Sequence, residues 1–158
     1  MIRTARHEDA QGIIDSHSRS IQEICKNDYT LKEIKAWSGS KRKPTSWCQS
    51  IDRDMLWVVE KDQKIEGFAH LAFMSETTAE ILGLYLSLKV KGRGAGKELF
   101  ELMKGEASNR DIQSIELLAT VTAKQFYTRM GCQEISGLKS LTIGGVPISC
   151  IPMIYKLS

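Results

Sequence analysis

The spacing of apolar residues predicts helices in the first third of the chain. Residues 2–5 have the pattern of a short strand, and apolar side chains then recur every three or four positions over residues 10–24. This period is typical of an amphipathic helix. Thr30 and Glu33 match a capping box, which predicts the start of a second short helix, and a helical turn is expected within residues 46–51.

From residue 55 onward the apolar positions alternate or run continuously, as they do in strands. Strands are expected at residues 55–60, 65–74, 79–86, 114–119, 132–143 and 146–157, with helices after a glycine-rich turn at 91–96 and at 123–130. The first two of these strands should form a hairpin. The order predicts a mixed α/β (α+β) fold in one domain, residues 1–158, with a mostly antiparallel central sheet of about six or seven strands and about four flanking helices.

Length and composition fit a globular domain and exclude several classes of protein. The chain has 158 residues, of which 42% are hydrophobic, so a proper core can form. Its 22 basic and 19 acidic residues leave a net charge of +3, which is too weak for a nucleic-acid-binding surface. No apolar stretch has the length of a membrane span, and the N-terminus lacks the apolar core of a signal peptide. A cytoplasmic location without membrane contact is therefore expected.

The four cysteines are scattered, at Cys25, Cys48, Cys132 and Cys150. No two of them have the C-x-x-C spacing of a zinc knuckle or a thioredoxin-type redox pair. Cysteines in such an arrangement are expected to be reduced and mostly buried. The sequence therefore predicts no metal site.

The segment with the most chemical content is the turn at residues 91–96, Lys-Gly-Arg-Gly-Ala-Gly. It follows an apolar strand and opens a helix, where the first backbone N–H groups lack an acceptor and the helix dipole is positive. Lys91, Arg93 and Lys97 add positive charge, so the pattern predicts an anion site. The turn matches neither a P-loop nor a dinucleotide fingerprint. The alternative is a turn that only connects the strand to the helix.

This turn resembles the pyrophosphate loop, [QR]-x-x-G-x-[GA], of the GNAT (GCN5-related) N-acetyltransferases. Gly94 and Gly96 occupy the glycine positions, and Lys91 replaces the usual Gln or Arg. A second segment, residues 123–132, is similar to the family pattern A-x-x-F-Y-x-x-x-G-F, with Cys132 in place of the final Phe. The resemblance implies a GNAT-like fold and acetyl-CoA as the co-substrate.

The resemblance also implies which residues contact the cofactor. Tyr85 and Leu86 would pair with the pantetheine arm through their backbone, as in the central strand of the family. Thr120 stands where many members have Asn. The remaining contacts implied are Lys91, Gly92, Arg93, Gly94, Ala95, Gly96, Lys97 and Phe126.

The implied reaction is direct transfer of the acetyl group to a primary amine of a small molecule, peptide or protein, in a ternary complex. The amine must be neutral to attack, although a free alkyl amine has a pKa of about 10.4. Glu80 is the candidate base, with a water chain or His70 as alternatives, and Tyr127 is the candidate acid for the departing thiolate. No metal takes part.

An acceptor pocket is expected between the first two helices and the middle strands. Its candidate lining residues are His17, Ser20, Tyr29 and Trp37, although core packing would also explain them. His70 is a further candidate for contact with the substrate. The acceptor itself is not identified by this pattern, and the resemblance allows a homodimer. The alternative function is a catalytically silent module that binds or senses acyl-CoA on the same fold.

Overall fold

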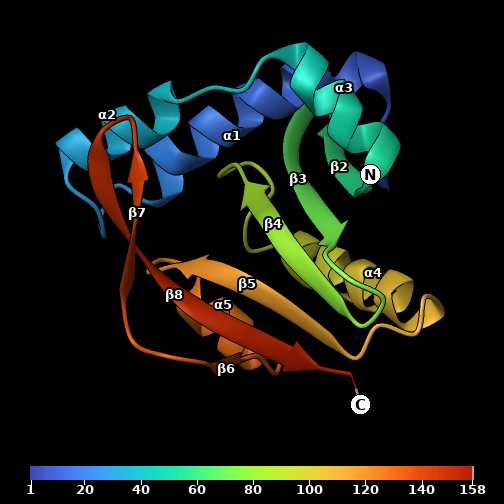
Figure 1. Cartoon of the computed structure of the whole chain (residues 1–158). Coiled ribbons are helices and arrows are strands. Elements are labelled where there is room, and N and C mark those ends of the chain that lie inside the picture. Colours follow the sequence, from blue (N-terminus) through green and yellow to red (C-terminus); the bar gives the residue numbers. More distant parts are fainter. Residues whose placement is uncertain (158) are drawn as a thin grey trace.

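An eight-stranded sheet forms the centre of the computed structural model, which describes residues 1–157 (Figure 1). The strands are β1 (Ile2–Thr4), β2 (Met55–Lys61), β3 (Lys64–Phe73), β4 (Thr78–Leu86), β5 (Ser114–Thr120), β6 (Gln133–Glu134), β7 (Lys139–Ile143) and β8 (Val146–Lys156). They lie in the order β1-β2-β3-β4-β5-β8-β6, and β7 also pairs with β8. Among the described strands, the pair β4–β5 is parallel and the other pairs are antiparallel.

Helices cover both faces of the sheet (Figure 1). They are α1 (Ala10–Ile24), α2 (Leu31–Gly39), α3 (Pro44–Arg53), α4 (Ala95–Asn109) and α5 (Lys124–Arg129), with a short 3₁₀ turn at His7–Asp9 before α1. Helices α4 and α5 pack on one face around Leu99 and Phe100, which are fully buried. Helices α1 and α3 pack on the other face around Ile13 and Phe68, and α1 and α2 enclose a smaller cluster with Ile148 of β8.

The predicted mixed, mostly antiparallel fold is confirmed, with two differences in the elements. The helical turn expected at 46–51 is the longer helix α3, which begins at Pro44, a residue favoured in the first turn. The strand expected at 132–143 is divided into β6 and β7. Its residues 135–138 lie opposite only two residues of β8, and one of these, Pro152, has no N–H to donate. The ladder therefore breaks there.

The two central parallel strands diverge, and their divergence creates the site. Strands β4 and β5 pair only from Thr78 and Ser114 to Ile81 and Leu117. Beyond that point β4 stays with β3, and β5 stays with β8. A bulge at Leu82 bends β4 where the separation begins, because the β3–β4 register shifts by one residue there. The edge of β4 that faces β5 therefore presents backbone N–H and C=O groups without a sheet partner over residues 82–86.

Within residues 1–157, no helix is both long and apolar enough to cross a membrane.

Candidate functional site

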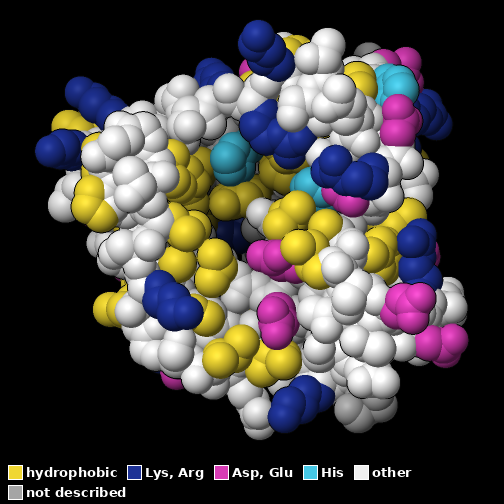
Figure 2. Space-filling model, viewed as in Figure 1, with side chains coloured by type: hydrophobic (Ala, Val, Ile, Leu, Met, Phe, Trp, Pro, Cys, Tyr) yellow, Lys and Arg dark blue, Asp and Glu magenta, His cyan; other side chains and the backbone are white. Residues whose placement is uncertain are grey.

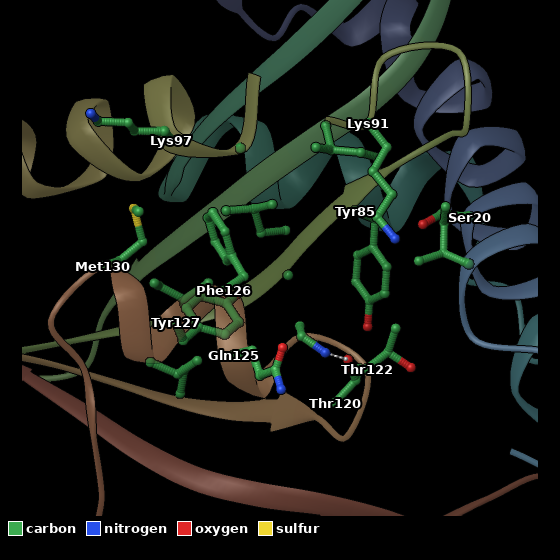
Figure 3. Close-up of a pocket in the computed structure, with 18 of the residues that line it drawn as sticks. Ser20, Tyr85, Lys91, Lys97, Thr120, Thr122, Gln125, Phe126, Tyr127 and Met130 are labelled. Carbon is green, nitrogen blue, oxygen red and sulfur yellow. Dashed lines mark hydrogen bonds between the residues drawn. The ribbon is translucent and has the colours of Figure 1, made fainter. Parts of the chain in front are cut away.

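The gap between β4 and β5 opens into a cavity of about 550 Å³ (Figure 3). The cavity is bounded by both strands, the C-terminal end of α1, the first turn of α4 and the short helix α5. The space-filling view also shows a hollow in one face of the molecule, with hydrophobic, basic, histidine and acidic side chains around it (Figure 2). Within the part of the chain that the structure describes, the lining of the cavity itself includes no histidine or acidic residue. The cavity is large enough for an extended organic ligand.

One end of the cavity is built to receive an anion. Gly92 and Gly94 have φ angles of +76° and +86°, a conformation that side chains disfavour. Gly94 is the N-cap of α4, and no side chain caps the helix. The first intrahelical bond runs from Glu98 N to Gly94 O at 3.0 Å, so the N–H groups of residues 95–97 have no helical acceptor. These groups and the helix dipole favour a phosphate-type anion.

Three cations line the cavity. Lys91 and Lys97 come from the turn and the first turn of α4, and Arg129 comes from α5. Sequence reasoning missed Arg129, although it lies three residues after Phe126 and so shares a helix face with that predicted residue. Their combined charge suits a ligand with more than one negative charge.

Gly96 allows the start of α4 to approach the cavity wall. A Cβ atom at this position would lie 3.2 Å from Cε2 of Phe126 and 3.6 Å from Cδ1 of Leu86. The contact joins α4, α5 and the end of β4 at one point. A larger residue at this position would crowd the Phe126 ring and disturb this contact.

Tyr127 lines the cavity from α5, next to Phe126 (Figure 3). Its ring packs against Phe126 and Phe100, with centroid distances of 5.1 and 6.3 Å. Burial, together with the neighbouring Tyr85 and Cys132, raises the pKa of Tyr127 above its ordinary value. The phenol therefore stays protonated at neutral pH and can donate a proton or a hydrogen bond.

Thr120 also lines the cavity, at the end of β5. Its hydroxyl accepts a hydrogen bond from the Ala123 N–H at 3.0 Å, which the close-up shows (Figure 3). The hydroxyl therefore holds the turn that leads into α5.

Aromatic side chains pack between the sheet and α1, behind one wall of the cavity. Tyr85 lines the cavity, and its ring stacks on Phe68 at 5.6 Å and meets His17 edge-on at 4.4 Å. Burial raises the pKa of Tyr85 above its ordinary value. Burial and the nearby Arg42 lower the pKa of His17 to about 4, so its imidazole is neutral at neutral pH.

Tyr29 and Trp37 belong to the packing behind this wall. The Tyr29 hydroxyl donates to the Ser149 carbonyl at 2.7 Å and accepts from the Val121 N–H at 2.9 Å. Trp37 is buried and meets the Tyr29 ring edge-on at 5.3 Å. The Tyr29 hydroxyl therefore joins the segment before α2 to β8 and to the residue that follows β5.

His70 and Glu80 lie on β3 and β4 outside the cavity lining. His70 is buried and bonds through Nε2 to Asp54 Oδ2 at 2.7 Å; burial lowers its pKa despite this partner. Glu80 directly precedes the lining residue Ile81 and stands opposite Glu116 in the β4–β5 register. Burial and the Glu116 carboxylate raise the pKa of Glu80.

The cavity thus brings together most of the predicted cofactor residues and one of the two predicted catalytic residues. The lining includes Tyr85, Leu86, Lys91, Gly92, Gly94, Gly96, Lys97, Thr120, Phe126 and Tyr127. Two predicted residues lie outside the lining: Arg93, which is exposed, and Ala95, which packs against the core. The predicted acceptor residues His17, Tyr29, Trp37 and His70 do not line it, whereas Ser20 does. Sequence reasoning also missed Ile24, Cys25, Thr122 and Gln125.

Among the described residues, no three His, Cys, Asp or Glu side chains are grouped as metal ligands. All four cysteines are free, and three of them are buried.

Comparisons with known proteins agree with this geometry. The family model of an acetyltransferase (GNAT) domain matches residues 25–155. A GCN5-related N-acetyltransferase from Rhodopseudomonas palustris has 18% identity and a TM-score of 0.86, with 99% of this chain and 95% of that chain covered. The PaiA N-acetyltransferase from Thermoplasma acidophilum, solved in complex with coenzyme A, has 21% identity and a TM-score of 0.76 over 99% and 98% of the two chains.

A third similar structure is YncA from Salmonella typhimurium, solved with its cofactor acetyl-CoA. It has 14% identity and a TM-score of 0.75, with 100% of this chain and 94% of that chain covered. At these identities the structural likeness concerns the fold. Among curated proteins, no sequence matches the chain.

Proposed function

The chain belongs to the GNAT family of acetyltransferases, and from that premise we propose that it transfers the acetyl group of acetyl-CoA to a primary amine of a small molecule, peptide or protein. The observation that carries this proposal is the cavity between β4 and β5, which has a free helix N-terminus at one end and a buried phenol in its lining. Transfer would occur by direct attack in a ternary complex.

The cavity residues fit acetyl-CoA along its length. The free N–H groups of residues 95–97, with Lys91 and Arg129, would hold the pyrophosphate. The unpaired edge of β4 over residues 82–86 would hydrogen-bond the amide groups of the pantetheine arm, as an added strand does. PaiA and YncA, which share the fold, were solved with coenzyme A and acetyl-CoA, and this also supports the assignment.

The acetyl transfer requires three contributions from the chain. A base must take a proton from the attacking amine, and Glu80 would do so through water because it lies just outside the cavity. Unpaired N–H groups at the bulge of β4 would stabilise the tetrahedral oxyanion. As the carbon–nitrogen bond forms and the carbon–sulfur bond breaks, the Tyr127 phenol would donate a proton to the departing thiolate and then regain one from solvent.

Calorimetric titration with acetyl-CoA and with coenzyme A tests the proposed function directly. We expect both to bind at micromolar concentrations, and a panel of amines assayed by release of the free thiol should then identify acceptors. A folded protein that binds neither compound would contradict the proposal.

The raised pKa of Glu80 predicts a particular pH profile. A base must be deprotonated, so activity should fall as the pH drops through a pKa above the ordinary 4.5. Glu80→Gln should remove this limb of the profile and lower kcat about 100-fold. Glu116→Gln should preserve the maximal kcat and move the limb to lower pH, because it removes the charge that opposes ionisation of Glu80. Rates of the three proteins from pH 4 to pH 9, about the usable range, test this.

Thermal unfolding provides the folding control for these variants. The folded state binds the Glu80 proton more tightly than the unfolded chain does, so the contribution of this group to stability decreases as the pH rises above 4.5. Glu80→Gln should therefore unfold at a slightly higher temperature than the wild type at pH 7. An unchanged kcat in a folded Glu80→Gln variant would assign the base to water.

A further inference from the structure

A carboxylate is buried next to the turn that leads from β4 to α4. Glu66 lies on β3 with 1% of its surface exposed. Its Oε2 accepts a hydrogen bond from the hydroxyl of Ser87 at 2.6 Å and lies 3.2 Å from Nη2 of Arg19. Ser87, which is also 1% exposed, is the first residue after β4. Burial of a carboxylate is unfavourable unless it is paired and hydrogen-bonded, and the reaction described above uses none of these three residues.

Ser87 fixes the first part of the turn. Its carbonyl accepts hydrogen bonds from the N–H groups of Val90 and Lys91, at 3.2 and 2.9 Å. Its own N–H donates to the carbonyl of Glu66 at 2.8 Å. Glu66 therefore holds Ser87 through both its backbone and its side chain, and Ser87 in turn holds Lys91, where the anion-binding segment begins.

Helix α1 holds the same turn from another direction. Arg19 donates to the Ile65 carbonyl at 2.9 Å as well as to Glu66, and Glu23, one helical turn later, accepts from the Leu88 N–H at 3.0 Å. Lys89 Nζ lies 3.7 Å from Glu66 Oε1. The turn is thus tied to β3 and to α1, the helix whose Ser20 and Ile24 line the cavity.

The charges around Glu66 keep it ionised. Burial would raise its pKa, but the Ser87 hydroxyl and the cations of Arg19 and Lys89 outweigh burial and leave the pKa below the ordinary value. An ionised acceptor makes the bond from Ser87 stronger than a neutral one would.

The glycine turn that Glu66, Ser87 and Arg19 hold has little stiffness of its own. Gly92 and Gly94 have open space around the position of a Cβ, and both have positive φ angles. Glycine loses more backbone freedom on ordering than any other residue. A glycine turn that had to become ordered on binding would therefore reduce the affinity for its ligand.

We propose that Glu66 and Ser87 are positioning residues for acetyl-CoA, which hold the β4–α4 turn so that the free N–H groups at the start of α4 face the pyrophosphate before it binds. This inference rests on the proposed function, because it takes the turn as the pyrophosphate site. Neither residue lines the cavity, and both act through Lys91 and the backbone of the turn.

The test measures coenzyme A affinity and amide hydrogen exchange in the wild type, Ser87→Ala and Glu66→Gln. Both variants should raise the dissociation constant for coenzyme A about tenfold, and the amides of residues 88–97 in the free protein should exchange faster than in the wild type. Exchange in β2 and β3 should stay unchanged. Ser16→Ala is the matched control, because it removes a buried hydroxyl that bonds only within α1, to the Ile13 carbonyl at 3.0 Å; its affinity should equal that of the wild type.

Two results would overturn this inference while leaving the proposed function intact. One is a folded Ser87→Ala variant that binds coenzyme A with wild-type affinity, because this substitution removes the hydrogen bond to Glu66 without changing any charge. The other is amide hydrogen exchange that is faster throughout the sheet in the variants and no faster in the turn than elsewhere. That result would indicate a general structural role. Failure of the wild type itself to bind coenzyme A would instead overturn the proposed function, and this inference with it.

Discussion

Replacing Gly96 by glutamate is expected to weaken acetyl-CoA binding on the order of 100-fold, for two physical reasons. The new Cβ would lie 3.2 Å from the Phe126 ring, so the ring or the start of α4 must move by a few tenths of an ångström. The new carboxylate would also bring a negative charge to the helix end that should receive the pyrophosphate. Calorimetric titration of the variant with acetyl-CoA measures the loss.

Helix α4 provides the matched control for this substitution. Gly105 lies on the same helix and is exposed, and a Cβ added there would meet no other atom within 4 Å. Gly105→Glu adds the same charge to the same helix, far from its N-terminus, and should bind acetyl-CoA like the wild type. Equal affinities of Gly96→Glu and the wild type would show that the ligand does not use the start of α4.

Replacing Tyr127 by phenylalanine is expected to lower kcat by about 100- to 1,000-fold, the usual contribution of a positioned general acid. The affinity for acetyl-CoA should change little, because the buried ring keeps its packing against Phe126 and Phe100. Steady-state kinetics with an identified acceptor, together with calorimetry, separate the two effects. A loss of kcat at constant affinity indicates an interaction made in the transition state.

Tyr155 provides the control for loss of a phenol hydroxyl. It lies on β8, packs its ring against Phe100 at 5.6 Å and does not line the cavity. Tyr155→Phe should therefore keep the wild-type kcat. An unchanged kcat in Tyr127→Phe would restrict Tyr127 to packing and assign protonation of the thiolate to solvent.

The sequence alone predicted the features that depend on neighbouring residues. The capping box is observed, because Glu33 N donates to Thr30 Oγ1 at 3.2 Å and the Glu33 carboxylate accepts from Thr30 N at 2.8 Å. The strand–turn–helix around Gly94 forms as expected, because the conformation of a turn depends mainly on its own residues. Most predicted cofactor residues line one cavity for the same reason, since they come from two short contiguous segments.

Features that depend on distant residues required the tertiary structure. The break between β6 and β7 depends on Pro152 in the partner strand, and the roles of His70 and Glu80 depend on Asp54 and Glu116. A local pattern shows that such residues lie in strands but not which partners they meet, because register and pairing depend on the whole sheet.

The cavity and the hydrogen bonds around Glu66 show most clearly what a local sequence pattern does not predict. Its opening depends on where β4 and β5 stop pairing, although the whole of α4 separates the two strands in the chain. The Glu66–Ser87 bond spans 21 residues, and its partner Arg19 lies 47 residues before Glu66. The sequence thus determined which segments line the cavity. Only the tertiary structure decided how far apart those segments lie and how they are oriented, because burial and pairing of distant groups arise when the chain packs as a whole.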